Sequence, residues 1–226
     1  MKKKEIGILG LGSMGTAIAK HLKKKYKIYG YDIKKFNTLK SSKNFFFTKN
    51  LKEIFLKTNI FIVIVLDEDQ CQKIFDSFID IKKRLKIKKN YTIINCTTVS
   101  PNWVKKTYKK LQKNNFEYID CPVSGGPKKA INGKLSLMIS SKKNIYKKNL
   151  TLLRDIGSNI YNLGNKIGTG STVKIINNSL AGIQIISAAE AIILAKKEKI
   201  NLKKIFKIIN NSSGHSWMFN DRGKRM

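Results

Sequence analysis

Glu5-Ile6-Gly7-Ile8-Leu9-Gly10-Leu11-Gly12-Ser13-Met14-Gly15 is the stretch that decides the fold of this chain. A short apolar run, typical of a buried strand, ends at a glycine and passes through the G-x-G-x-x-G turn of Gly10, Gly12 and Gly15. Residues 16–20 then have helical character. The stretch therefore predicts a strand, a tight turn and a helix, an arrangement that suits a dinucleotide.

The turn suits a pyrophosphate because a compact dianion is best met by backbone N–H groups at a helix N-terminus. Gly10 permits the sharp turn, Gly12 lets the backbone approach the phosphates, and Gly15 lets the helix pack closely on the strand. The predicted cofactor-binding residues of the turn are Gly10, Leu11, Gly12, Ser13, Met14 and Gly15.

A second predicted strand, at 27–31, ends at Asp32, about 20 residues beyond the first glycine, where dinucleotide-binding folds carry an acidic residue. Its carboxylate would accept hydrogen bonds from the adenosine ribose and repel a 2′-phosphate, so NAD is favoured over NADP. Lys34 and Lys35 follow closely and weaken that preference. The alternative is a glycine turn in another kind of α/β unit.

Composition points to a folded chain, since 226 residues with 42% hydrophobic content can bury one large core or two smaller ones. The net charge is +32, but all except four of the 46 basic residues are lysine, spread along the chain beside Ile, Asn and Phe. These residues share A/T-rich codons. Mutational bias therefore explains the charge better than a polyanionic partner, and we expect no nucleic-acid binding.

Cys71, Cys96 and Cys121 are odd in number and lack C-x-x-C spacing, so neither a disulfide framework nor a metal site is expected. The Met-Lys-Lys-Lys start runs almost directly into the glycine turn, which is too short for a signal peptide. Apolar runs near 59–66 and 180–194 are too short or too interrupted to span a bilayer. We expect a cytoplasmic protein with no membrane segment.

Strands and helices alternate through the first domain, predicted at residues 1–166. The continuous apolar run at 59–66 is typical of a strand buried on both faces of a parallel sheet. The pattern predicts an α/β fold with a doubly wound sheet of Rossmann type. Further strands are expected at 44–47, 91–95, 116–119, 135–139 and 158–163, and helices at 51–58, 70–78, from Pro101, and at 142–153.

In such a sheet the carboxyl ends of the strands line the ligand crevice. Leu66 and Asp67 are expected to border the cofactor there, although capping of the next helix is the favoured role of Asp67 and its acidic neighbours. Thr97 or Thr98 would touch the nicotinamide half of the cofactor or only cap a helix. The turn Ser124-Gly125-Gly126 suits a substrate carboxylate, although such turns are more often ordinary loops.

The composition changes at residue 167, where a second, all-α domain is predicted to begin and to extend to residue 226. Residues 171–199 form one long, mostly apolar helix pattern, which suggests a buried helix that bridges two domains or two subunits. Lys174 and Asn178 on it are four residues apart and share a face. Shorter helices follow at 202–209 and near Trp217.

Three motifs, at 10–15, 120–126 and 168–178, occur in the order and at the separations of the β-hydroxyacid dehydrogenases, and the chain resembles that family. The resemblance implies a Rossmann-type domain, a long interdomain helix, a helical C-terminal domain, and NAD-dependent oxidation of a small hydroxy acid. Residues 168–195 and 214–222 are most similar to a branch that acts on a four-carbon hydroxy acid.

The resemblance would make Lys174 the catalytic acid/base and would place Thr98 against the nicotinamide ribose. As hydride leaves the carbinol carbon, the hydroxyl must lose a proton, and a partly buried lysine with a lowered pKa can accept it. The same matching implies a set of substrate-binding residues, Ser124, Gly125, Gly126 and Asn178.

The family's helical domain continues beyond the last residue of this sequence, which makes the second domain incomplete by comparison. Apolar faces at 180–194 and after residue 202 would need cover. We expect a homo-oligomer formed through these C-terminal helices. The alternative to an active enzyme is an inactive, cofactor-binding remnant.

Overall fold

The computed structural model describes residues 3–34 and 41–226. It divides into two compact units, residues 1–174 and 175–226, and each is described by itself. The long helix α7 (Thr169–Lys197) contains the boundary between them. The predicted domain boundary after residue 166 stays a prediction.

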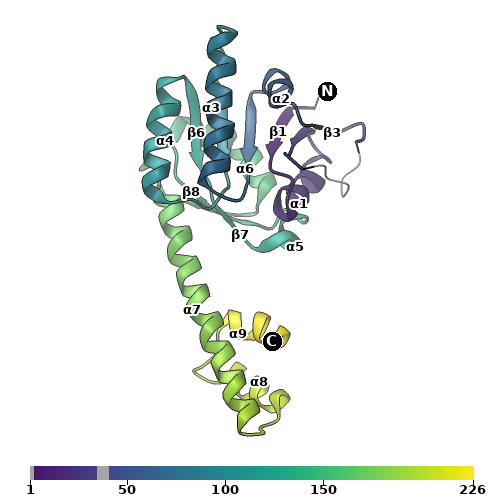
Figure 1. Ribbon diagram of the computed structural model, residues 1–226, viewed down its shortest axis with the longest axis vertical. Helices are drawn as coiled ribbons and strands as arrows, with labels where there is room; N and C mark the ends of the chain where they lie inside the picture. Colours follow the sequence, from purple (N-terminus) through teal and green to yellow (C-terminus); the bar gives the residue numbers. More distant parts are fainter. Residues whose placement is uncertain (1–2, 35–40) are drawn as a thin grey trace. The chain divides into compact units, whose positions relative to one another are not determined.

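A parallel six-stranded sheet is the centre of the first unit (Figure 1). The chain runs outward from β1 to β3 on one side and from β4 to β6 on the other, giving the order β3-β2-β1-β4-β5-β6. This confirms the predicted doubly wound sheet of Rossmann type. The strands are β1 (Glu5–Leu9), β2 (Lys27–Tyr31), β3 (Phe45–Thr48), β4 (Ile60–Val63), β5 (Tyr91–Asn95) and β6 (Phe116–Asp120).

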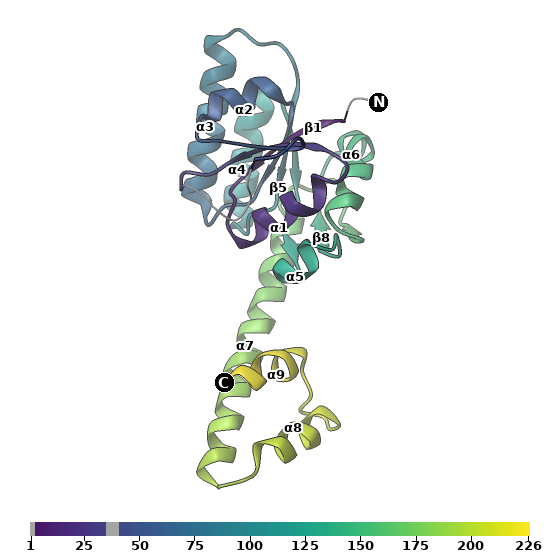
Figure 2. The ribbon, with the colours of Figure 1, turned by 90° about the vertical axis from the view of Figure 1, so that its right-hand side faces the viewer.

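Helices cover both faces of this sheet (Figure 2). One face carries α1 (Ser13–Leu22) and α6 (Lys143–Ile156), and the other carries α2 (Leu51–Lys57), α3 (Glu68–Arg84) and α4 (Pro101–Lys113). The starts of α2, α3 and α4 are fixed by side-chain oxygens that accept backbone N–H groups of the first turn. These caps are Asn50, Asp67 and Ser100.

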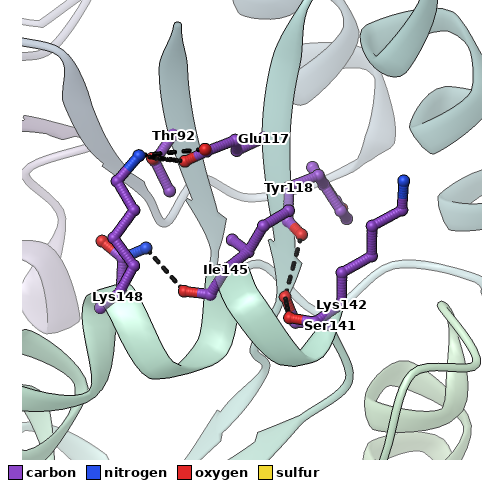
Figure 3. A network of polar contacts seen from close by, with 8 residues as sticks. Thr92, Glu117, Tyr118, Ser141, Lys142, Ile145 and Lys148 are labelled. Atoms are coloured by element: carbon purple, nitrogen blue, oxygen red, sulfur yellow. Dashed lines mark hydrogen bonds and ion pairs between the residues drawn. The ribbon is translucent and has the colours of Figure 1, made fainter.

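A polar cluster ties α6 to the sheet (Figure 3). The Lys148 ammonium on α6 donates to both carboxylate oxygens of Glu117 on β6, at 2.9 and 3.0 Å. Thr92 on β5 donates its hydroxyl to the same carboxylate at 2.7 Å. The cluster holds helix and strands in register at the edge of the sheet.

The sheet face beneath α3 has an aromatic core that surrounds one buried lysine. Lys82 is only 6% exposed, and its Nζ donates to the carbonyls of Asn114 and Asn115 just after α4, at 3.0 and 2.9 Å. The same ammonium lies over the rings of Tyr91 and Phe116, with centroids at 5.7 and 4.9 Å. These contacts compensate the ammonium for its loss of water.

The expected strand at 59–66 is wrong in its length, because β4 ends at Val63. Ile64 still donates its N–H to Leu9 at 2.9 Å, but the N–H of Val65 turns to the Thr97 hydroxyl at 3.0 Å. Leu66 is 78% exposed. The apolar run continues past the end of the strand, so hydrophobicity alone does not show where the chain leaves the sheet.

A second, three-stranded sheet follows the first, in the order β7-β8-β9. Strands were predicted at 135–139 and 158–163, and β8 (Ser136–Ile139) and β9 (Asn159–Asn162) lie there. The separate sheet, the short β7 (Val123–Ser124) and the helix α5 (Gly126–Ala130) were not predicted. Strand β7 pairs antiparallel with β8, so the Ser-Gly-Gly turn begins on a strand of this second sheet.

The second unit is helical, with a small core formed by Ala188, Ile192 and Phe219. Its helices are the rest of α7, then α8 (Leu202–Asn210), α9 (Trp217–Arg222) and the 3-10 turn η1 (Gly223–Arg225). Helix α7 is long and apolar enough to cross a membrane by length and composition alone. Helices of soluble proteins meet the same criterion, so this feature assigns no location.

We predict that Lys82→Met lowers the free energy of unfolding by about 1–3 kcal/mol, because two part-buried carbonyls lose their donor. Lys83→Met, at the exposed neighbouring position, is the matched control and should change stability little. Urea unfolding of both variants makes the measurement. Equal stability of the two variants would show that the Lys82 contacts contribute nothing.

Candidate functional site

A cleft of about 840 Å³ lies where β1, β2 and β4 end. Most of the predicted cofactor-binding residues line it, namely Gly10, Gly12, Ser13, Met14, Gly15, Asp32 and Leu66. Leu11 is buried beneath the cleft and contributes its backbone N–H instead. The residues are brought together by the parallel sheet, whose strand ends share one edge.

The glycine turn combines tight packing with one open position. Gly10 has a φ of +94°, and a Cβ on Gly15 would lie 1.9 Å from the Gly10 carbonyl oxygen. A Cβ on Gly12 would meet nothing within 4 Å. Gly12 also caps α1 without a side-chain hydrogen bond, so the first N–H groups of that helix are left for an anion.

Asp32 is held in place by two backbone donors. Its Oδ2 accepts the N–H of Leu11 at 2.7 Å, and its Oδ1 accepts the N–H of Lys34 at 2.9 Å. Each carboxylate oxygen keeps a lone pair for a ribose hydroxyl. Lys34 lines the cleft as well, whereas Lys35 lies outside the described residues.

One wall of the cleft was missed by the sequence reasoning. It is the face of α3 that carries Gln70, Lys73, Ile74 and Ser77. Their spacing of three, four and seven residues places them on one side of a helix. This periodicity is the feature of the sequence that could have identified them as one face of α3. Gln70 also accepts the N–H of Leu66 at 3.3 Å, which supports the loop after β4.

The other residues predicted at strand ends have different surroundings. Asp67 is the N-cap of α3 and accepts the Gln70 N–H at 2.9 Å, which confirms the capping interpretation. Thr97 is buried and fixes Val65, while Thr98 is exposed. Of the residues that the structure describes, neither Asp67 nor Thr98 lines the cleft.

The Ser124-Gly125-Gly126 turn lies between β7 and α5. Gly125 and Gly126 have positive φ angles of 127° and 72°, a region that favours glycine. A Cβ on Gly126 would meet nothing within 4 Å, so the backbone is open to a ligand there. Helix α5 in turn packs against α1, where the His21 ring contacts the Ile131 carbonyl at 3.2 Å. The turn is thus braced by the helix that follows the glycine motif.

Lys174, on the second turn of α7, is buried and only 9% exposed. Burial lowers its pKa below the ordinary value of 10.5. Within residues 3–34 and 41–226, no carboxylate pairs with its ammonium, so nothing offsets that loss of water. Asn178 belongs to the second unit and is exposed.

No cluster of three or more His, Cys, Asp or Glu that could hold a metal ion occurs in the described part of the chain. The groups that line the cleft suit an organic anion. The cleft offers free backbone N–H groups, an open approach at Gly12 and a fixed carboxylate at Asp32. These features fit the pyrophosphate and the adenosine ribose of NAD.

Two family profiles match the chain and together cover most of it. Residues 5–164 match the NAD binding domain of 6-phosphogluconate dehydrogenase. Residues 168–226 match the NAD-binding domain of NADP-dependent 3-hydroxyisobutyrate dehydrogenase.

Curated relatives and a solved structure agree with these profiles. L-threonate dehydrogenase of Haemophilus influenzae is 29% identical over 98% of this chain and 74% of its own length. Mitochondrial 3-hydroxyisobutyrate dehydrogenase of Mus musculus is 31% identical over 95% of this chain and 64% of its own. A crystal structure titled 3-hydroxyisobutyrate dehydrogenase, from Salmonella typhimurium, is 29% identical with a TM-score of 0.86, covering 98% of this chain and 78% of that one.

We predict that two alanine substitutions in the glycine turn affect different properties, one the binding of the cofactor and the other the stability of the fold. Gly12→Ala should leave the melting temperature unchanged but weaken NADH binding about tenfold or more, because its methyl group enters only the space open to a ligand. Gly15→Ala should destabilise the fold itself, because its Cβ would collide with the Gly10 carbonyl. Thermal unfolding and NADH fluorescence titration separate the two effects. If Gly12→Ala binds NADH as tightly as the wild type, the dinucleotide does not bind against Gly12.

Proposed function

This chain belongs to the NAD-dependent β-hydroxyacid dehydrogenase family, and we propose that its substrate is L-threonate, which it oxidises to 2-dehydro-L-erythronate. Relatives from Haemophilus influenzae and Escherichia coli that carry the name L-threonate dehydrogenase support this substrate, at 29% and 30% identity. The sequence at 214–222 supports it too.

A second candidate is oxidation of 3-hydroxyisobutyrate or reduction of 2-hydroxy-3-oxopropionate. The names of the mouse relative and of the Salmonella structure favour the first of these activities. All these substrates are small acids in which the reacting hydroxyl or carbonyl lies on the carbon next to the carboxylate or one carbon further away. The same residues would therefore serve each reaction.

The observation that carries the proposal is the burial of Lys174, whose ammonium pairs with no carboxylate among the residues that the structure describes. A lysine whose pKa is lowered by burial is neutral in a larger fraction of molecules and can accept a proton. In the proposed reaction the neutral Nζ takes the proton of the substrate hydroxyl as the carbonyl forms. NAD, when bound, supplies the acceptor for the hydride that leaves the same carbon. In the reverse direction the charged amine returns the proton.

Substrate orientation is assigned in this proposal to the Ser124-Gly125-Gly126 turn and to Asn178. The turn supports this role because it offers one hydroxyl and an open backbone approach at Gly126. Asn178 lies one helical turn after Lys174, so its amide is available for a substrate hydroxyl. Thr98 is assigned to the nicotinamide side of the cofactor, and its exposure is compatible with that role.

We further propose that copies of the chain associate through the apolar face of α7. Large aliphatic side chains are exposed along it, including Leu180 at 57%, Ile183 at 63% and Ile186 at 61%. Exposed aliphatic side chains at intervals of three residues lie along one side of a helix and suit an interaction surface. Sedimentation of the purified chain tests the proposal, and a monomer at all concentrations would contradict it.

Activity is tested by NADH formation with L-threonate, 3-hydroxyisobutyrate and glycerate as substrates. We expect the highest kcat/KM with L-threonate. Lys174→Met should lower kcat by about 10²–10⁴-fold, because the proton acceptor is lost, and leave NADH affinity unchanged. The control is Lys197→Met, at an exposed position on the same helix. Turnover retained by Lys174→Met would remove this lysine from the mechanism.

The pH dependence has a defined sign. Oxidation requires neutral Lys174, so its rate should rise with pH and level off above a pKa lower than 10.5. The folded state also penalises the charged amine, so unfolding free energy should rise with pH from that pKa up to the unfolded value. Lys174→Met should lack this increment and be at least as stable as the wild type near neutral pH. Urea unfolding across the pH range measures it, and a variant with the wild-type pH dependence would contradict the prediction.

A further inference from the structure

Asp120 is a fully buried carboxylate at the end of β6 that accepts three hydrogen bonds. Its Oδ1 accepts the Ser171 hydroxyl at 2.7 Å. Its Oδ2 accepts the Ser171 N–H at 3.0 Å and the Ser140 hydroxyl at 2.9 Å. Ser171 belongs to the first turn of α7, so this set of contacts, the Asp120 anchor, joins the sheet to the start of that helix.

The backbone of α7 lies directly on the strand ends at this point. The N–H of Gly170 donates to the Ser140 hydroxyl at 3.3 Å. A Cβ on Gly170 would lie 2.4 Å from the Met138 carbonyl oxygen and 3.1 Å from Asp120 Oδ2. The helix could not approach so closely with any other residue at this position.

The anchor lies one helical turn before Lys174. Residues three and four apart share a helix face, so Lys174 projects from the same side as Ser171 and Gly170. Ser171 is fully buried and Lys174 is 9% exposed, whereas Ile176, two residues later, is 55% exposed. The docked turn is therefore what takes the Lys174 side chain out of water.

Stability alone is a poor explanation for the anchor. In the described part of the chain no basic side chain pairs with Asp120. Burial raises the pKa of Asp120, which means that the folded state disfavours the charged carboxylate relative to the unfolded chain. A neutral side chain of the same size would fill this position with a smaller loss of hydration free energy. The carboxylate instead fixes the orientation of Ser171, because each of its two oxygens accepts a hydrogen bond from that residue.

We propose that Asp120 and Ser171 are positioning residues for the dehydrogenase reaction, because their contact sets the place of Lys174 and keeps water away from its amine. This inference rests on the proposed function. It predicts that loosening the anchor impairs the proton transfer while leaving the cofactor cleft intact.

The first test compares Ser171→Ala with Ser187→Ala. The Ser187 hydroxyl donates to the Ile183 carbonyl of its own helix and is exposed, which makes it the matched control. Ser171→Ala should lower kcat about tenfold or more, since a small misplacement of a catalytic group is costly. NADH affinity should stay unchanged. The acidic limb of its pH profile should move to higher pH, because water reaching Lys174 restores the ordinary lysine pKa.

Steric displacement gives an independent test. Gly170→Ala should push the first turn of α7 away from Met138 and reproduce the kinetic effect and the shifted pH limb. Gly182→Ala is its control, because a Cβ there meets nothing within 4 Å. Asp120→Asn keeps an acceptor and a donor for Ser171 and should retain more activity than Asp120→Ala.

A readout without turnover completes the design. Acetylation of Lys174 by acetic anhydride, followed over pH by peptide mass spectrometry, reports the pKa of its amine directly. Ser171→Ala and Gly170→Ala should shift the curve to higher pH, and both controls should not. An unshifted curve and pH limb, with activity lost only in proportion to unfolded protein, would make the anchor merely structural and overturn the inference. If the wild type oxidises no hydroxy acid while the labelling shift appears, the proposed function fails and the positioning stands.

Discussion

The hydrogen bonds between the Asp120 carboxylate and the first turn of α7 are the contact on which the arrangement of the first unit depends. They connect the last strand of the main sheet to the helix that carries Lys174. Ser140, directly after β8, donates to the same group, so one buried carboxylate joins its own strand β6 to the end of β8 and to α7. A charge of this kind must be surrounded by donors, which fixes all three elements at once.

The cofactor cleft follows a different principle, in which backbone groups and empty space do most of the work. Gly15 is closely packed and Gly12 is open, so the same motif both closes the fold and leaves room for a ligand. Asp32 is oriented by two backbone N–H groups rather than by a cation, which leaves its charge available to ribose hydroxyls. Lys174 likewise lacks a counter-charge among the described residues, and its burial favours the neutral amine.

Local patterns predicted the parts of this protein that depend on neighbouring residues. The glycine turn, the strand ending at Asp32, the cap at Asp67 and the long helix containing Lys174 could all be read from periodicity and turn chemistry. The end of β4 at Val63 could not, because the hydroxyl that receives the next N–H is on Thr97, far along the chain. The separate sheet formed by β7, β8 and β9 also depends on distant pairing.

The sequence by itself determined the doubly wound fold and the chemical groups of the cofactor cleft, since spacing within a strand, turn or helix is encoded by adjacent residues. Only the tertiary structure decided which face of α3 closes the cleft, and that Asp120 meets Ser171. These two residues are 51 positions apart, and nothing local to either specifies the contact. Burial, and with it the lowered pKa of Lys174, arises only when the elements pack together.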